Sequence, residues 1–390
     1  MRNFAREEEI NRERIRRLAN WYLGKKEGPI HIDAELHKRC NLNCSFCPRS
    51  GSGHDSNAES KTNELFTEQW IKTVRDASEM GVAVFNLEGA NEPIYVPELA
   101  FPVIEEIKKA GMYGILTTNG TLWTEEKLKN LVDIKWDRIH FSVDAPDAEI
   151  HDSLRGIKGS FEMAMQSIKL LNKWKERIGS NLPMLNMNIM ICNKNYYKLP
   201  EMVELANKLK VDYIFVEPLM IFSESGKKLK IKDEDVKNRL PNYIKDAKAL
   251  ADKYEIDNNF SKQDKNLDED LVVEENKKKV LIKDLEVLAD KDIKKGTLLS
   301  APCFKPWTRI AIKYDGLTGH CGLIQDGESL KEKSLREIWY GEWLDNIRNK
   351  MMKGQLLEHC SQCVPSDITQ RRRFRRELLA ILDDTHGLYN

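Results

Sequence analysis

Seven of the eight cysteines in this 390-residue chain fall into two groups, and these groups point most directly to chemistry. The groups have the spacings C-x3-C-x2-C and C-x17-C-x38-C-x2-C, and their members are Cys40, Cys44 and Cys47, then Cys303, Cys321, Cys360 and Cys363. Disulfides are rare in reducing compartments, so clustered thiols indicate metal ligation or catalysis there.

The first group can hold one iron–sulfur cluster from a single loop. Three thiolates leave one iron of a four-iron cube without a protein ligand, and a reactive site needs such an open position. Spacing alone leaves a second interpretation open, a zinc site completed by a distant histidine.

The second group suits either tetrahedral zinc or a fully ligated four-iron cluster. A β-hairpin that turns at Asp315 and Gly316 would bring Cys303 and Cys321 together. A helix over 338–352 would deliver Cys360 and Cys363 to the same place. Spacing alone favours zinc.

The elements that must position these thiols alternate between strand and helix from residue 28 to 222. Six short apolar runs predict strands, at 30–36, 82–88, 113–119, 137–144, 184–192 and 213–221. We expect an α/β fold: a partial (β/α)6 TIM-type barrel with a small C-terminal iron–sulfur module and a charged helical insertion. The first cysteine group follows the first strand, where loops of this fold carry the chemistry.

Composition shifts divide the chain into five predicted segments. These are an N-terminal helix (1–27), the partial barrel (28–223), a charged helical insertion or linker (224–300), an auxiliary-cluster domain (301–365) and a basic C-terminal helix (366–390). The insertion is interpreted as a solvated segment, with a substrate lid as the alternative.

The charge balance excludes some classes of function. Lys plus Arg and Asp plus Glu both number 62, so there is no global basic field for nucleic acid. No apolar run is long enough to cross a bilayer, and the N-terminus lacks the apolar core of a signal peptide. We therefore expect a cytoplasmic protein that binds neither membrane nor nucleic acid.

Four motifs in order make residues 30–222 resemble the radical S-adenosylmethionine (SAM) superfamily. They are CNLNCSFC (40–47), EGANEP (88–93), TTNGTLW (117–123) and FSVDAPDAEIHDSLRG (141–156). The second departs from the usual Gly-Gly-Glu-Pro, because Ala90 and Asn91 stand where two glycines are common.

The resemblance implies a [4Fe–4S] cluster held by three cysteines and SAM, with a role for each motif residue. It implies Glu92 for the SAM ammonium, Arg155 for the carboxylate, and Ser142 with Asp144 for the carboxylate or ribose. Phe46, beside the last cysteine of the loop, and Asn119, in the Thr-Asn-Gly turn, belong to the same site. The adenine is expected near Met190 or Leu219.

The C-terminal module is similar to the auxiliary-cluster domain of SPASM and twitch radical SAM enzymes, such as the 2-deoxy-scyllo-inosamine dehydrogenases. That resemblance implies a second [4Fe–4S] cluster rather than zinc. Four ligands leave no open iron, so an electron acceptor is the expected role, and a structural cluster is the alternative.

The implied reaction is reductive cleavage of SAM to a 5′-deoxyadenosyl radical, which abstracts a substrate hydrogen. Oxidation of a small polar metabolite is the first interpretation, with reduced flavodoxin or ferredoxin as electron donor. A peptide- or protein-modifying maturase is the second, and a non-catalytic zinc-and-iron scaffold the third.

Cys192 is the one cysteine outside the two groups. Strand alternation places Asn188, Met190 and Cys192 on one face. In one interpretation Cys192 donates a hydrogen atom in an epimerase, and in the other it is a buried small hydrophobe.

Overall fold

A computed structural model of the chain describes residues 5–47, 63–221, 223–260, 296–322, 326–358, 360, 363 and 373–382. One nine-stranded sheet organises these residues, in the order β7-β6-β5-β4-β3-β2-β1-β8-β9. Its strands are β1 (His31–Ala34), β2 (Val84–Leu87), β3 (Tyr113–Thr118), β4 (Arg138–Ser142), β5 (Met184–Ile191), β6 (Tyr213–Pro218), β7 (Asp257–Asn258), β8 (Arg309–Ile312) and β9 (Thr318–Gly319). All neighbouring strands are parallel except β8 and β9. The sheet stays open, so it is a partial TIM-type barrel, as predicted.

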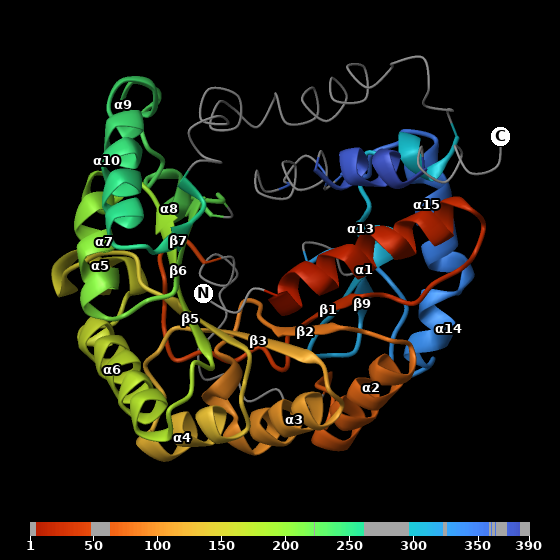
Figure 1. Ribbon diagram of the computed structural model, residues 1–390, viewed down its shortest axis with the longest axis horizontal. Helices are drawn as coiled ribbons and strands as arrows, with labels where there is room; N and C mark the ends of the chain where they lie inside the picture. The colour runs from red at the N-terminus through yellow and green to blue at the C-terminus, as the bar shows by residue number, and fades with distance from the viewer. Residues whose placement is uncertain are drawn as a thin grey trace.

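Helices surround the sheet in an arc (Figure 1). Those of the barrel are α2 (Thr67–Glu79), α3 (Pro97–Lys109), α4 (Glu125–Asp133), α5 (Ala148–Arg155), α6 (Ser160–Ile178), α7 (Leu199–Lys208), α8 (Glu224–Lys227), α9 (Asp233–Asn238) and α10 (Leu240–Lys253). Short 3-10 helices are η3 (Pro93–Tyr95), η4 (Tyr196–Lys198) and η5 (Leu298–Ser300). No helix within the described ranges is both long and apolar enough to cross a bilayer.

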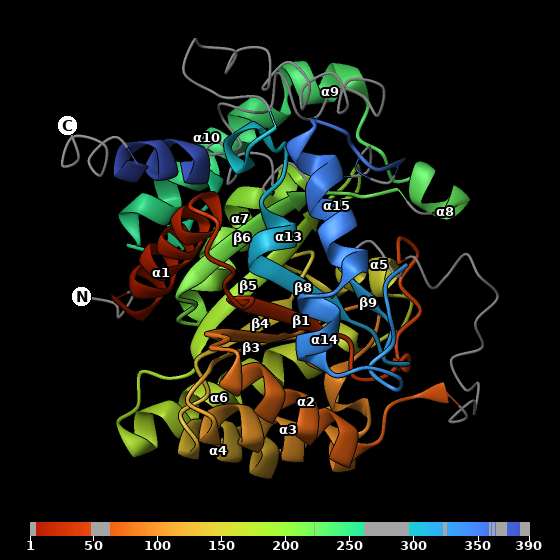
Figure 2. The same cartoon turned by 90° about the vertical axis from the view of Figure 1, so that its right-hand side faces the viewer.

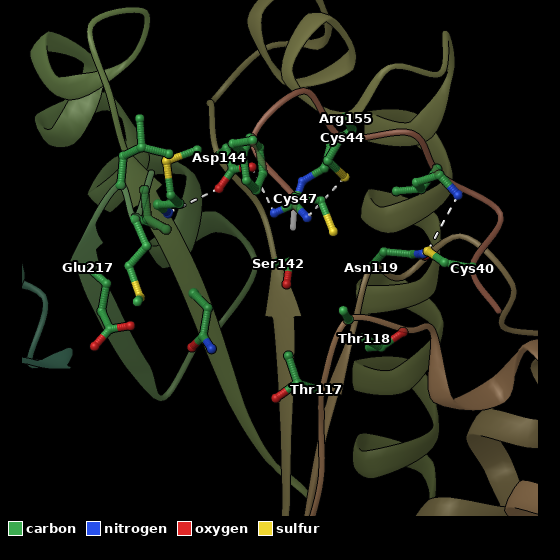
Figure 3. A pocket seen from close by; sticks show the side chains of 18 of the residues that line it. Cys40, Cys44, Cys47, Thr117, Thr118, Asn119, Ser142, Asp144, Arg155 and Glu217 are labelled. Carbon is green, nitrogen blue, oxygen red and sulfur yellow. Dashed lines mark hydrogen bonds and ion pairs between the residues drawn. The ribbon is translucent and has the colours of Figure 1, made fainter. Parts of the chain in front are cut away.

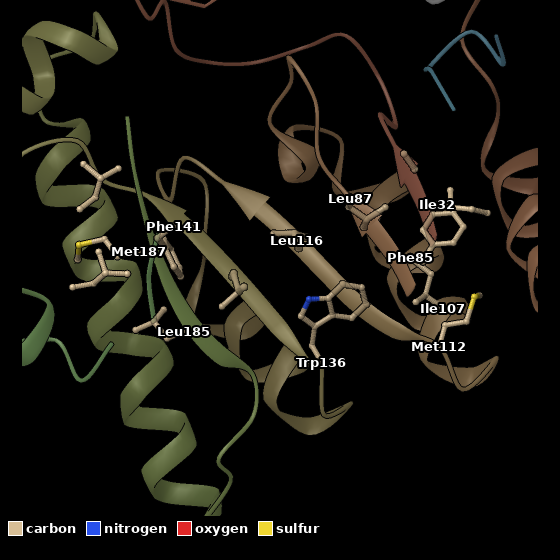
Figure 4. Packing of buried hydrophobic residues seen from close by; sticks show 14 of the residues in the cluster. Ile32, Phe85, Leu87, Ile107, Met112, Leu116, Trp136, Phe141, Leu185 and Met187 are labelled. Atoms are coloured by element: carbon tan, nitrogen blue, oxygen red, sulfur yellow. The ribbon is translucent and has the colours of Figure 1, made fainter. Parts of the chain in front are cut away.

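Alternation along each strand separates a dry core from a polar inner face. The apolar core lies between strands and helices (Figure 4), and its labelled members are Ile32, Phe85, Leu87, Ile107, Met112, Leu116, Trp136, Phe141, Leu185 and Met187. Trp136 packs so closely on Gly114 that a Cβ there would meet its ring at 2.4 Å. The intervening strand residues are polar, for example Asp33, Asn86 and Asn188, which gives the inner side of the barrel its hydrogen-bonding character.

The charged region after residue 223 is tied to the barrel, at least as far as Phe260. α10 buries Ile244 and Ala247 in the main core, and β7 pairs with β6. Asn259 exchanges two hydrogen bonds with the backbone of Val216 in β6, at 2.9 and 2.8 Å. The segment is therefore a further strand-and-helix unit of the sheet in its first part. Residues 261–295, the rest of the predicted insertion, lie outside the described residues.

The C-terminal module continues the sheet on its other side (Figure 2). Its elements are α13 (Lys305–Thr308), the predicted hairpin β8–β9, α14 (Leu335–Trp339) and α15 (Glu342–Met352). The single helix predicted over 338–352 is wrong, because the chain breaks between α14 and α15 at Gly341. A Cβ at Gly341 would lie 2.5 Å from the carbonyl oxygen of Glu337.

A buried ion pair fastens this module to the barrel. Arg309 of β8 donates to Asp33 of β1 at 2.9 Å, and His31 lies 2.9 Å from the other carboxylate oxygen. Burial opposes ionisation, yet Arg309 and His31 hold the pKa of Asp33 far below its usual range. The two domains thus share one sheet and one charge network.

The N-terminal and C-terminal helices pack against each other and against the core. α1 spans Ala5–Tyr22, and residues 373–382 form a helix near the C-terminus. Phe374, Leu378 and Leu382 of that helix are buried in the core, and Arg14 of α1 lies 5.1 Å from the Phe374 ring. The apolar side of the C-terminal helix therefore faces the protein.

Candidate functional site

A cavity of about 400 Å³ opens at the carboxyl ends of the barrel strands (Figure 3). The predicted residues on its wall are Cys40, Cys44, Phe46, Cys47, Asn119, Ser142, Asp144, Arg155, Met190 and Leu219. Loops at this end carry the chemistry in barrels, and the volume is within the usual range for ligand sites. The structure thus brings together, around one space, four motifs that are spread over more than 100 residues of the chain.

The three thiols of the first group line this cavity on a loop that follows β1. Leu42 N donates to Cys40 Sγ at 3.5 Å, and Asn119 Nδ2 approaches the same sulfur at 3.7 Å. Cys47 N donates to the carbonyl of Cys44 at 3.1 Å, which makes the C-x2-C segment a tight turn. Donors aimed at the Cys40 sulfur favour its thiolate form, as ligation of an iron–sulfur cluster requires.

Helix α5 fixes the position of the loop. Asn43 N donates to the carbonyl of Arg155 at 3.2 Å, and Ser45 N donates to that of Leu154 at 3.1 Å. Gly156 ends α5 with φ +75°, and a Cβ there would lie 2.2 Å from Asn43 O. Only glycine allows this close approach, which explains the glycine of the Arg-Gly pair.

Arg155 is the cation that faces the thiols. Its Nη2 lies 2.7 Å from Asp144 Oδ2, its Nη1 3.9 Å from Cys44 Sγ, and its guanidinium 5.4 Å from the Phe46 ring. Burial opposes the charge, but Asp144 and Cys44 raise the pKa of Arg155 above its ordinary value. The guanidinium is thus charged and oriented at the cavity wall, as carboxylate binding requires.

Asp144 is held by three neighbouring segments. Its Oδ1 accepts from Met190 N at 3.0 Å, and its backbone N–H donates to His151 Nδ1 at 3.2 Å. Burial lowers the pKa of His151 to about 4, with Arg155 adding to the effect. His151 is therefore neutral and can accept this bond. Asn195 Nδ2 donates to the Asp144 carbonyl at 2.7 Å.

Glu92 lies behind the cavity wall rather than on it. Its two carboxylate oxygens accept from Thr118 Oγ1 and Asn119 N, both at 2.7 Å. Burial raises the pKa of Glu92 to about 7. Glu92 therefore positions the Thr-Asn-Gly turn, whose Asn119 lines the cavity. Its direct contact with SAM stays a prediction.

The altered residues of EGANEP have local partners. Ala90 N donates to Glu35 Oε1 at 2.9 Å, and Asn91 Nδ2 donates to the carbonyl of His37 at 2.7 Å. Gly89 has φ +137°, and a Cβ there would lie 2.8 Å from Glu35. These bonds hold the EGANEP segment against residues just before the loop 40–47, which we call the cluster loop. The bond to His37 is made by the Asn91 side chain, so a glycine at this position could not form it.

Cys192 does not line the cavity. It is fully buried in a small apolar cluster with Leu154 and Leu229, and burial raises the pKa of its thiol to about 11. Asn188 and Met190 do line the cavity. β5 ends at Ile191, so strand alternation no longer governs the direction of Cys192. The packing interpretation is favoured.

Sequence reasoning missed several residues of the site. Thr117, Phe215 and Glu217 line the cavity from β3 and β6, whereas His151 and Asn195 support Asp144. Thr117 and Glu217 are polar residues at the ends of apolar strands, a signal that could have identified them. His151 and Asn195 act through backbone contacts, which leave no pattern in the sequence.

The second cysteine group lies in the C-terminal module. Cys303 and Cys363 are buried, and Cys363 N donates to the carbonyl of Cys360 at 3.3 Å. Cys47 N donates in the same way to the carbonyl of Cys44 in the first loop, at 3.1 Å. No three His, Cys, Asp or Glu side chains in the described ranges are grouped to hold a single metal ion.

Two family models match parts of this chain. A radical SAM superfamily model matches residues 35–191, and a SPASM model, an iron–sulfur cluster-binding domain, matches residues 303–364. The chain therefore contains a radical SAM domain followed by a SPASM domain. Its cofactors are SAM with a [4Fe–4S] cluster in the radical SAM domain and auxiliary iron–sulfur in the SPASM domain, which contains all four cysteines of the second group.

Two curated relatives each match about half of this chain. A tungsten-containing aldehyde ferredoxin oxidoreductase cofactor-modifying protein of Pyrococcus furiosus is 29% identical over 192 residues, 49% of this chain and 51% of that protein. An AdoMet-dependent heme synthase of Methanosarcina barkeri is 30% identical over 187 residues, 48% of this chain and 50% of that protein. The matches thus span about half the length of each.

Solved radical SAM structures share the fold. Streptococcus suis SuiB bound to SAM is 18% identical, with a TM-score of 0.59 over 83% of this chain and 68% of that chain. The AdoMet-bound anSMEcpe structure is 16% identical, with a TM-score of 0.58 over 86% of this chain and 87% of that chain. At these identities the likeness concerns the fold alone.

Proposed function

We propose that the protein is a radical SAM oxidoreductase that oxidises a small polar substrate, with the auxiliary cluster as electron acceptor. One observation carries the proposal: the three thiols, the Arg155–Asp144 ion pair and the polar ends of the strands all line the same cavity. When bound, SAM and its cluster supply an organic radical that takes a hydrogen atom from an unactivated carbon.

The chain's own residues bind and orient the cofactor. Arg155 presents its guanidinium to the SAM carboxylate, held in place by Asp144 and stacked on Phe46. Met190 and Leu219 offer apolar surface for the adenine. Glu92 keeps the Asn119 turn in place behind the cavity wall.

The substrate end of the cavity is polar. Asn188 and Glu217 line it from β5 and β6. Glu217 lies across the cavity from the three cysteines (Figure 3). An amide and a carboxylate bind hydroxyl and amine groups, so alcohols and amines are the expected substrates.

The experiment is SAM cleavage by the anaerobically reconstituted protein with dithionite as reductant. We expect Cys44→Ala to abolish 5′-deoxyadenosine formation, because two thiolates cannot retain the cluster. Cys303→Ala should still cleave SAM but lose oxidised product, since the electron acceptor is removed. Strong 5′-deoxyadenosine formation by Cys44→Ala would overturn the assignment, and undiminished product from Cys303→Ala would make the auxiliary cluster structural.

Modification of a peptide is the second candidate. It is supported by the fold shared with SuiB, one solved structure of which is bound to the precursor peptide SuiA. The two curated relatives, by their names, modify a cofactor and synthesise heme, so larger substrates belong in the same screen. The buried position of Cys192 weakens the epimerase form of this candidate.

A further inference from the structure

A second cavity, of about 810 Å³, shares the cluster loop with the first one. Its wall includes Ser45, whose neighbours Cys44 and Phe46 line the cofactor cavity. Four cations and an exposed tyrosine also line it, and we call this site the basic groove: Lys194, Lys228, Lys232, Arg239 and Tyr197, with Ser45. The groove and the thiols are therefore separated by the thickness of one loop.

The charge of the groove is strongly positive. Within the described part of the chain, Lys194, Lys228 and Lys232 are exposed and form no ion pair. Arg239 lies 3.3 Å from Asp235, the one carboxylate among the residues that line the groove. Such a local excess of positive charge attracts an acidic surface and steers its approach, although the whole chain has no net charge.

The wall between groove and thiols is fixed by hydrogen bonds on both sides. Ser225 Oγ of α8 donates to the carbonyl of Ser45 at 2.7 Å, and Ser45 N donates to the carbonyl of Leu154 at 3.1 Å. Tyr197 packs edge-on against Tyr196, at 5.6 Å between ring centres, and presents an aromatic surface of the kind common in protein interfaces. A partner seated here would be held close to the first cluster.

We propose that the basic groove is the docking site for the protein that reduces the first cluster, a small acidic carrier with a flavin or iron–sulfur centre. This inference rests on the proposed function, because only a redox site needs such a donor. One electron leaves the carrier, which is oxidised by one electron, and enters the cluster held by Cys40, Cys44 and Cys47. No covalent bond changes and no proton transfer is required.

The test measures binding of flavodoxin, and separately of ferredoxin, to the immobilised holoenzyme by surface plasmon resonance. The variant Lys228→Glu/Lys232→Glu reverses charge in the groove. The matched control, Lys169→Glu/Lys208→Glu, makes the same change at two exposed helix lysines that form no ion pair within the described residues and do not line the groove. We expect the groove variant to raise Kd at least tenfold at about 50 mM salt, and the control to stay within twofold.

Activity supplies the second readout. SAM cleavage driven by dithionite should be equal in wild type and both variants, whereas cleavage driven by the carrier protein should fall only in the groove variant. Equal Kd values for the groove and control variants, or no binding of either carrier to wild type at low salt, would overturn the docking site. Absence of SAM cleavage with dithionite in wild type would instead contradict the proposed function and leave the binding result to be judged separately.

Discussion

Arg155 Nη2 lies 2.7 Å from Asp144 Oδ2, and this buried ion pair joins the end of α5 to the end of β4. The same arginine approaches Cys44 and stacks on Phe46. One side chain thus connects the cluster loop, the proposed SAM carboxylate site and the strand end that carries Asp144. Its position depends on Asp144, and that dependence can be tested.

Asp144→Asn should weaken SAM binding at least tenfold, about 1.4 kcal/mol, because it removes the charge that orients Arg155. Equilibrium dialysis of SAM against the reconstituted protein measures the effect. Asp147→Asn is the matched control, since Asp147 caps α5 through Ile150 N and asparagine caps helices equally well. Equal SAM affinity in the two variants would show that Asp144 does not position the site.

Gly156→Ala should destabilise the cluster loop. The new Cβ would have to occupy space 2.2 Å from Asn43 O, in addition to the strain of a positive φ. Gly179→Ala is the control, because Gly179 ends α6 with φ +70° and has no atom within 4 Å of such a Cβ. Strain alone costs about 1 kcal/mol, so Gly179→Ala should keep its iron, while Gly156→Ala should retain less. Equal iron contents would contradict the proposed contact.

The stability of the protein should fall in acid partly through His151. Its pKa is about 4 in the folded protein, below its usual 6.5, because of burial and Arg155. Below pH 6.5 the unfolded chain therefore binds a proton at His151, whereas the folded protein does not. As the pH falls from 6.5 toward 4, the free energy of unfolding decreases, by about 3 kcal/mol in all.

The measurement is the Tm difference between wild type and His151→Asn from pH 7.5 to 5. Asn Oδ1 can accept the hydrogen bond from Asp144 N but does not titrate. Wild type should lose stability relative to the variant as pH falls. A constant difference across this range would show that His151 titrates normally.

Cys192→Ala should leave SAM cleavage unchanged, since the thiol is buried and does not line the cavity. The lost packing should cost about 1 kcal/mol of stability, an ordinary value for a small core truncation. Product analysis in D2O gives the decisive comparison. Deuterium at an inverted substrate carbon in wild type, absent in Cys192→Ala, would restore the hydrogen-donor role.

Residue type and spacing were enough to predict the partial barrel, and ten of the residues that they single out line one cavity. Runs of apolar residues fix the parallel strands, and Cys40, Asp144 and Arg155 follow those strands at the expected ends. The placement of β8 beside β1 was not predictable, because the pairing joins segments almost 280 residues apart through Asp33 and Arg309. The position of Glu92 behind the cavity wall was not predictable either. It depends on a hydrogen bond from Thr118, at the Thr-Asn-Gly turn, and local sequence does not indicate such a contact between distant residues.

Metal content with EPR spectroscopy tests the central claim most directly. The account predicts about eight irons and no zinc per reconstituted chain, with the EPR signal of the reduced protein perturbed by SAM, as expected for two four-iron clusters of which one is open. About four irons with one zinc, or a signal that SAM leaves unchanged, would contradict it. Zinc in place of the second cluster would mean that the protein has no auxiliary electron acceptor. A signal unchanged by SAM would mean that SAM does not bind the first cluster.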